Sequence, residues 1–89
     1  MPKAKASVGK LREAVREVLN MSPGYRINDA GLARSVDELL PLHEVRELET
    51  LQAAEWNLGK GYVDSYDNED TDEREWFITS DGQAKERVG

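Results

Sequence analysis

Apolar residues in the first two thirds of the chain recur at alternating steps of three and four positions. This spacing places them on one side of a helix. It predicts three helices, over about residues 8–19, 29–40 and 43–58, with Ser7 and Asp29 as expected N-caps of the first two. The apolar faces are Val8, Leu11, Val15 and Val18 in the first helix, Leu32, Val36, Leu39 and Leu40 in the second, and Val45, Leu48, Leu51 and Leu58 in the third.

After Gly61 the pattern changes from helical spacing to alternation with a period of two. Residues 62–66 and 75–79 are rich in aromatic and β-branched side chains and predict the two strands of a hairpin. A charged loop separates the strands, and a short piece of extended chain is expected at residues 25–27. Asp81 is placed to begin a last short helix over residues 82–88.

These elements predict the fold class α+β, in a single small domain. The chain has 89 residues, which is enough for one compact domain. We expect a flexible basic tail at residues 1–6 and the domain at residues 7–89. The expected core contains Leu11, Val15, Val18, Leu32, Val36, Leu48, Leu51, Leu58, Trp76 and Ile78.

Two short motifs carry a resemblance to a known family. The first is Leu58…Gly61-Tyr62-Val63, at the end of the third predicted helix; the second is Trp76-Phe77-Ile78-Thr79…Gly82, in and after the second strand. In these positions the chain resembles winged-helix domains, including regulators of the MarR and PadR type and small bacterial winged-helix proteins. The resemblance implies three helices, a β-hairpin wing and a short C-terminal helix. It also implies that the third helix would enter the major groove of DNA and that the wing would reach the minor groove or the phosphates.

The charge distribution disagrees with that usual function. The net charge is −6, and the sequence from residue 35 onward holds fifteen acidic residues against five Lys and Arg. DNA affinity depends largely on Lys and Arg that neutralise phosphates, and acidic residues dominate both the third helix and the wing. We therefore expect a non-enzymatic module that binds a protein through an acidic surface, with a basic protein as one candidate partner. Its expected contact residues are Glu44, Glu47 and Asp70, with Phe77 as an aromatic anchor.

The alternative is a DNA-binding transcriptional regulator. On the third helix, Arg46 and Gln52 are the side chains suited to reading base edges. Residues 1–34 hold seven Lys and Arg against three acidic residues, so this region is the other candidate for nucleic-acid binding. Its expected phosphate contacts are Lys3, Lys5, Lys10, Arg12 and Arg16.

The sequence contains no pattern typical of an enzyme or of a metal or cofactor site. It has no cysteine and one histidine, His43, so the common zinc ligand sets are excluded. The Gly59-Lys60-Gly61 run is short and follows a helix C-terminus, where an anion is disfavoured. No apolar run approaches the ~20 residues of a membrane-spanning helix, and a cytoplasmic protein is expected.

Overall fold

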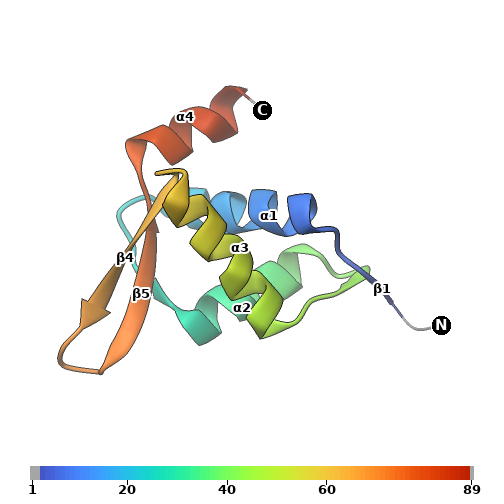
Figure 1. The fold of residues 1–89 in the computed structure, drawn as a ribbon, viewed down its shortest axis with the longest axis horizontal. Helices are drawn as coiled ribbons and strands as arrows, with labels where there is room; N and C mark the ends of the chain where they lie inside the picture. The colour runs from blue at the N-terminus through green and yellow to red at the C-terminus, as the bar shows by residue number, and fades with distance from the viewer. Residues whose placement is uncertain (1–2, 89) are drawn as a thin grey trace.

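The computed structural model describes residues 3–88 and contains, within that range, four helices, a three-stranded antiparallel sheet and a two-stranded parallel pair (Figure 1). The predicted α+β class is therefore confirmed. The helices are α1 (Val8–Met21), α2 (Asp29–Leu39), α3 (Glu47–Gly59) and α4 (Ser80–Val88). The strands are β1 (Ala4–Lys5), β2 (Ile27–Asn28), β3 (His43–Glu44), β4 (Val63–Asn68) and β5 (Glu73–Ile78).

Side-chain caps begin the first two helices. The Ser7 hydroxyl accepts a hydrogen bond of 3.1 Å from the Lys10 amide at the start of α1, as predicted. At α2 the cap is Asn28, whose Oδ1 accepts from the Gly31 amide at 2.8 Å. The prediction of Asp29 as the cap was therefore wrong by one residue. Asp29 instead occupies the first turn of α2, where a carboxylate interacts favourably with the helix dipole.

The main sheet has the strand order β2-β5-β4. β4 and β5 form a hairpin that projects away from the helices (Figure 1), with Val63 opposite Ile78 at its base and Asn68 opposite Glu73 at its end. Both strands continue further into the charged segment than predicted, so only the four residues 69–72 form the turn. Strand pairing continues there because solvent-exposed polar side chains do not oppose it. The turn is closed by a bond of 2.7 Å from the Asp72 amide to the Asn68 carbonyl, with Asp72 at a positive φ of 61°.

Residues 4–6 have a defined place. Ala4–Lys5 pairs in parallel with His43–Glu44, and Ala6 is buried at the edge of the core. This pairing corrects the expected start of the third helix. The described part of the predicted tail lies along the domain, while Met1 and Pro2 lie outside the described residues. α3 begins at Glu47 and not at His43, because His43 and Glu44 are extended.

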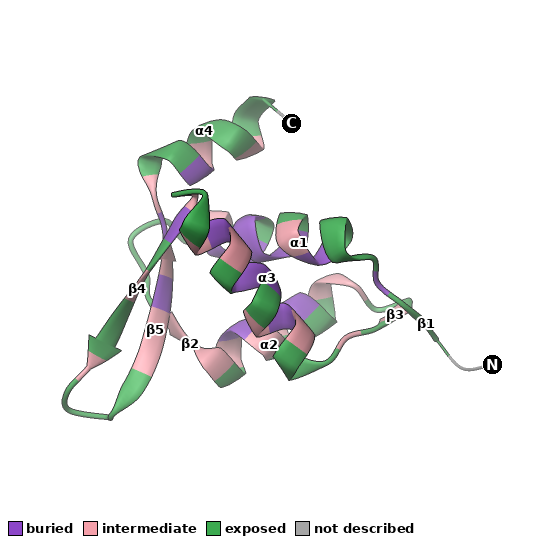
Figure 2. Ribbon diagram, in the orientation of Figure 1, coloured by how far each residue is buried: buried purple, intermediate pink, exposed green. Residues whose placement is uncertain are grey.

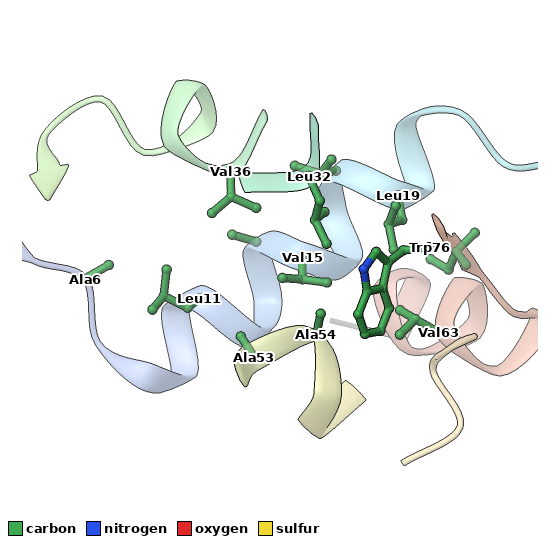
Figure 3. Packing of buried hydrophobic residues seen from close by; sticks show 13 residues of the cluster. Ala6, Leu11, Val15, Leu19, Leu32, Val36, Ala53, Ala54, Val63 and Trp76 are labelled. Carbon is green, nitrogen blue, oxygen red and sulfur yellow. The ribbon is translucent and has the colours of Figure 1, made fainter. Parts of the chain in front are cut away.

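The core lies where α1, α2, α3 and the base of the hairpin meet (Figure 2). Its interior is close-packed aliphatic side chains around the indole of Trp76 (Figure 3). Seven of the ten predicted core residues are buried: Leu11, Val15, Val18, Leu32, Val36, Trp76 and Ile78. Leu58 is half-buried and packs against this cluster.

The predicted buried face of α3 was wrong. Leu48 is 69% exposed and Leu51 is half-buried. The buried residues of the helix are the smaller Thr50, Ala53, Ala54 and Asn57. Small side chains allow α1 and α3 to approach closely, and this packing outweighs the greater apolar surface of Leu48.

α4 is fixed to the turn between α3 and β4 by two residues of the second motif. Thr79 Oγ1 lies 2.6 Å from the Gly61 carbonyl oxygen and 2.9 Å from that of Tyr62, and it accepts a hydrogen bond of 3.0 Å from the Gly82 amide. A Cβ atom on Gly82 would lie 1.9 Å from the Tyr62 carbonyl oxygen. Only glycine allows this approach, which explains the spacing of Thr79 and Gly82. The resulting arrangement is compatible with a winged-helix fold.

Two single leucine-to-alanine substitutions test the corrected core. Leu32→Ala should lower the free energy of unfolding by ~2–5 kcal/mol, because Leu32 is fully buried. Leu48→Ala should change it by less than about 0.5 kcal/mol, because Leu48 is largely exposed. Chemical denaturation of both variants measures the difference, and equal losses would contradict the assigned face of α3.

Two glycine substitutions test the docking of α4. Gly82→Ala should destabilise the domain by about 1–3 kcal/mol, because the added methyl group collides with backbone. Gly9→Ala, in α1, meets no atom within 4 Å and should stabilise by up to about 1 kcal/mol. Thermal unfolding gives both values; a neutral Gly82→Ala would show that α4 is not held against the Tyr62 carbonyl.

Candidate functional site

A cleft of about 440 Å³ lies between the N-terminal turns of α2 and α3 and the β4–β5 hairpin. We call it the acidic cleft. α2 contributes the residues next to its cap, α3 contributes its first residue, and the hairpin contributes both strands near the turn. Its lining consists of Asn28, Asp29, Ala30, Glu47, Asp67, Asp72, Glu73 and Arg74.

Five of these lining residues are carboxylates and one, Arg74, is a cation. Arg74 is fully engaged by its neighbours. Its guanidinium forms an ion pair with Glu55 of α3, donates to Ser65 Oγ at 3.2 Å and lies 4.1 Å from the centroid of the Trp76 ring. The arginine therefore holds the hairpin against α3 and leaves the cleft strongly negative.

The five carboxylates fall into two groups. Asp29 accepts a hydrogen bond of 2.6 Å from Trp76 Nε1, and Glu73 accepts one of 3.0 Å from Asn28 Nδ2. Within residues 3–88, the side chains of the other three make no ion pair or hydrogen bond with another side chain: Glu47, Asp67 and Asp72. The same part of the chain contains no group of three or more acidic or histidine residues arranged to hold a metal ion. What the cleft offers is three unpaired carboxylates that can attract ammonium or guanidinium groups.

The structure brings together part of the acidic surface predicted from the sequence. Glu47 lines the cleft, and Asp70 lies in the same exposed turn as Asp72. Glu44 belongs to β3 and pairs with Arg46 at 3.3 Å, away from the cleft lining. Phe77 is half-buried on the sheet face opposite Trp76, with the Arg26 guanidinium 5.5 Å from its ring centroid. The expected anchor is thus separated from the carboxylates.

The two predicted base-reading side chains of α3 are exposed but do not share a surface. Arg46 occupies the N-cap position and pairs with Glu44. Gln52 lines a small groove of about 160 Å³ between α1 and α3, next to Leu11 and Arg12. The α3 surface beside the hairpin presents Glu47 and Glu55 instead.

Two of the five predicted phosphate contacts are withdrawn from solvent. Arg16 is buried: its Nε pairs with Glu86 of α4 at 2.9 Å, and its Nη1 donates to Asn57 Oδ1 at 3.0 Å. This contact joins α1 to α4, so the expectation of a free guanidinium was wrong. Arg12 is half-buried with its guanidinium 4.3 Å from the centroid of the Trp56 ring. Lys3, Lys5 and Lys10 are exposed, as expected.

Two features of the surface were missed from the sequence. Asp29 joins the cleft because the N-cap of α2 is Asn28 and not Asp29. The sequence allows this, since asparagine is also a preferred N-cap residue. The second feature is a group of cations around Trp56 and Tyr62, which includes Lys60 and Lys85. These residues come from separate segments, and no local pattern indicates that they meet.

Comparison with known proteins does not add an assignment: no family model matches the chain, and no curated protein or solved structure matches it significantly. No helix in the described residues combines the length and the apolar character needed to cross a membrane.

Proposed function

We propose that the chain is a winged-helix domain that acts as a non-enzymatic protein-binding module, and that its acidic cleft binds a Lys- or Arg-rich segment of a partner. The fold part of this proposal is supported by the order of elements. α2, a turn and α3 are followed by a hairpin, and β2 pairs with the second hairpin strand. Three helices, a β-hairpin and a short C-terminal helix are the elements that the resemblance to winged-helix domains implies.

The single observation that carries the functional part is the set of unpaired carboxylates of Glu47, Asp67 and Asp72 beside an arginine that is already engaged. In the winged-helix arrangement, this is the region between the third helix and the wing. A phosphate backbone placed there would meet five carboxylates without a free cation. A basic segment would instead form several ion pairs at once.

Neutralising the three unpaired carboxylates tests the cleft. We expect the triple variant Glu47→Gln/Asp67→Asn/Asp72→Asn to bind a fluorescent Lys- and Arg-rich peptide about tenfold more weakly than the unmodified chain at low salt. Three exposed ion pairs of about 0.5 kcal/mol each account for that factor. Asparagine tolerates the positive φ of Asp72, so the turn should be retained. Fluorescence anisotropy at low and high salt measures the affinity.

A matched control removes the same charge elsewhere. Glu13, Glu17 and Asp37 are exposed residues of α1 and α2 outside the cleft lining. The variant Glu13→Gln/Glu17→Gln/Asp37→Asn should therefore bind the peptide nearly as well as the unmodified chain. Equal weakening by both triple variants would show that net charge alone attracts the peptide, and it would count against the cleft.

The competing function is duplex DNA binding through α3, which the winged-helix resemblance implies. We expect the unmodified chain to bind duplex DNA more weakly than ~10⁻⁴–10⁻⁶ M, the range of ordinary non-specific binding at physiological salt. Arg46→Ala and Gln52→Ala should leave any residual binding unchanged. Titration of labelled duplexes at two salt concentrations provides the measurement. A tight, sequence-selective complex that either substitution weakens would show that α3 reads DNA. The proposal that the acidic cleft binds a basic protein segment would then be wrong.

A further inference from the structure

Cations and aromatic rings gather where α1, α3 and α4 meet, at the end of α3 opposite the acidic cleft. We call this group the cation–aromatic patch. The two rings are those of Trp56 and Tyr62, whose centroids are 6.3 Å apart. Around them lie Arg12, Arg16, Lys60 and Lys85, each with its charged group 4.3–6.0 Å from one ring centroid.

Most of the charge in the patch has no ion-pair partner in the part of the chain that the structure describes. Arg16 is neutralised by Glu86, but Arg12, Lys60 and Lys85 form no ion pair among the described residues. The Nε atom of Arg12 is buried without a hydrogen-bond partner. The ring faces hold these cations near one another, because the quadrupole of an aromatic ring attracts positive charge. The patch therefore presents several fixed positive charges to an anionic partner.

The cations occupy positions over the ring faces, which determines the kind of anion that fits. Proteins that bind single-stranded nucleic acid stack its bases on aromatic ring faces. A nucleobase would have to displace Arg12 or Lys60 in order to stack on Trp56, so this ring is not open for stacking. Carboxylates can approach the ammonium and guanidinium groups without displacing them. A protruding acidic segment of a protein is thus the better match.

Each copy of this chain carries such a segment. The turn between β4 and β5, residues 69–72, is exposed and contains Glu69, Asp70 and Asp72. It is held in one shape by a bond of 2.9 Å from the Asp70 amide to Asn68 Oδ1, in addition to the backbone bond that closes it. In Figure 1 the turn lies at the far end of the projecting hairpin, and α4 lies on the opposite side of the molecule.

From this complementarity we propose that the acidic turn of one copy binds the cation–aromatic patch of a second copy. This inference rests on the proposed function, because the turn contributes Asp72 to the acidic cleft. The basic partner of the cleft and its turn would then be another copy of the same chain. The two surfaces are different, so the contact is heterologous: each copy that binds leaves one free turn and one free patch. Such contacts produce open chains or rings instead of a closed two-fold dimer.

Neutralising either surface should abolish this association. The patch variant is Lys60→Gln/Lys85→Gln and the turn variant is Glu69→Gln/Asp70→Asn. Analytical ultracentrifugation of the unmodified chain at low salt should show species that grow with concentration and dissociate at about 0.5 M salt, because ion pairs at an exposed contact are screened. Each variant alone should remain a monomer. The control variants Lys3→Gln/Lys5→Gln and Glu13→Gln/Glu17→Gln, at exposed positions outside both surfaces, should associate like the unmodified chain.

Mixing the two variants provides the sharpest test. The patch variant keeps an intact turn and the turn variant keeps an intact patch, so each pair can form one contact and no more. An equimolar mixture should contain a heterodimer of twice the 10.0 kDa chain mass and nothing larger. A mixture that stays monomeric, or one that forms larger species, would overturn the head-to-tail contact.

Three other outcomes would also overturn it, and they separate this inference from the proposed function. An unmodified chain that is monomeric at all concentrations but binds the basic peptide would leave the acidic cleft in place and remove self-association. A chain that neither associates nor binds the peptide would remove both. A monomeric chain that binds a ten-residue oligothymidylate, with loss of binding in the patch variant only, would assign the patch to nucleic acid.

Discussion

The burial of Trp76 is the constraint on which the rest of the structure depends. Its side chain is fully buried in the part of the core formed with Leu19, Leu32 and Val63 (Figure 3), and its backbone pairs with Ile27 on one side and Ser65 on the other. A buried indole N–H must have an acceptor, since leaving it unsatisfied costs about 1–3 kcal/mol. Asp29 supplies that acceptor and in doing so joins the sheet to the first turn of α2. One side chain thus fixes the positions of the hairpin and of α2.

This constraint also explains why part of the acidic cleft is structural. Asp29 is needed by Trp76, and Arg74 covers the same indole ring while it pairs with Glu55. The only cation in the cleft lining is therefore committed to holding the hairpin in place. Asp67 and Asp72 have no comparable structural contact with another side chain. Unpaired like charges close together destabilise a fold slightly, so packing within the domain does not account for these two carboxylates.

The sequence predicts the elements of this fold better than their faces. The steps of three and four correctly identify Leu11, Val15 and Val18 of α1 and Leu32 and Val36 of α2 as buried, because both helices bury large apolar side chains. Val8, which has the same spacing, is 60% exposed at the start of α1. α3 instead buries two alanines, a threonine and an asparagine. Its Leu48 has the spacing that predicts a buried position but is exposed, so spacing alone cannot distinguish it from a core residue. Asn57 is accommodated because its amide donates to the carbonyls of Arg12 and Ala53 and its Oδ1 accepts from Arg16. No one-dimensional pattern contains those tertiary partners.

The candidate sites show the same limit. The acidic character of the hairpin was evident from the sequence, since it depends on a continuous run of residues. The separation of Phe77 and Glu44 from that surface was not, because it depends on strand face and on the pairing of β1 with β3. The burial of Arg16 was equally hidden, since its partner Glu86 lies 70 positions later.

α3 sets the relation between the two charged surfaces. Glu47 at its start and Lys60 just after its end match the helix dipole, so these two charges also contribute to helix stability. Asp67, Asp72 and Arg12 lie outside α3, so the dipole of α3 does not explain their positions. They add negative charge near the start of α3 and positive charge near its end. A helix of 13 residues is about 20 Å long, more than twice the Debye length of about 8 Å at physiological ionic strength. The acidic cleft and the cation–aromatic patch therefore do not neutralise each other within one molecule, and the charges that lack an ion pair inside each surface stay uncompensated.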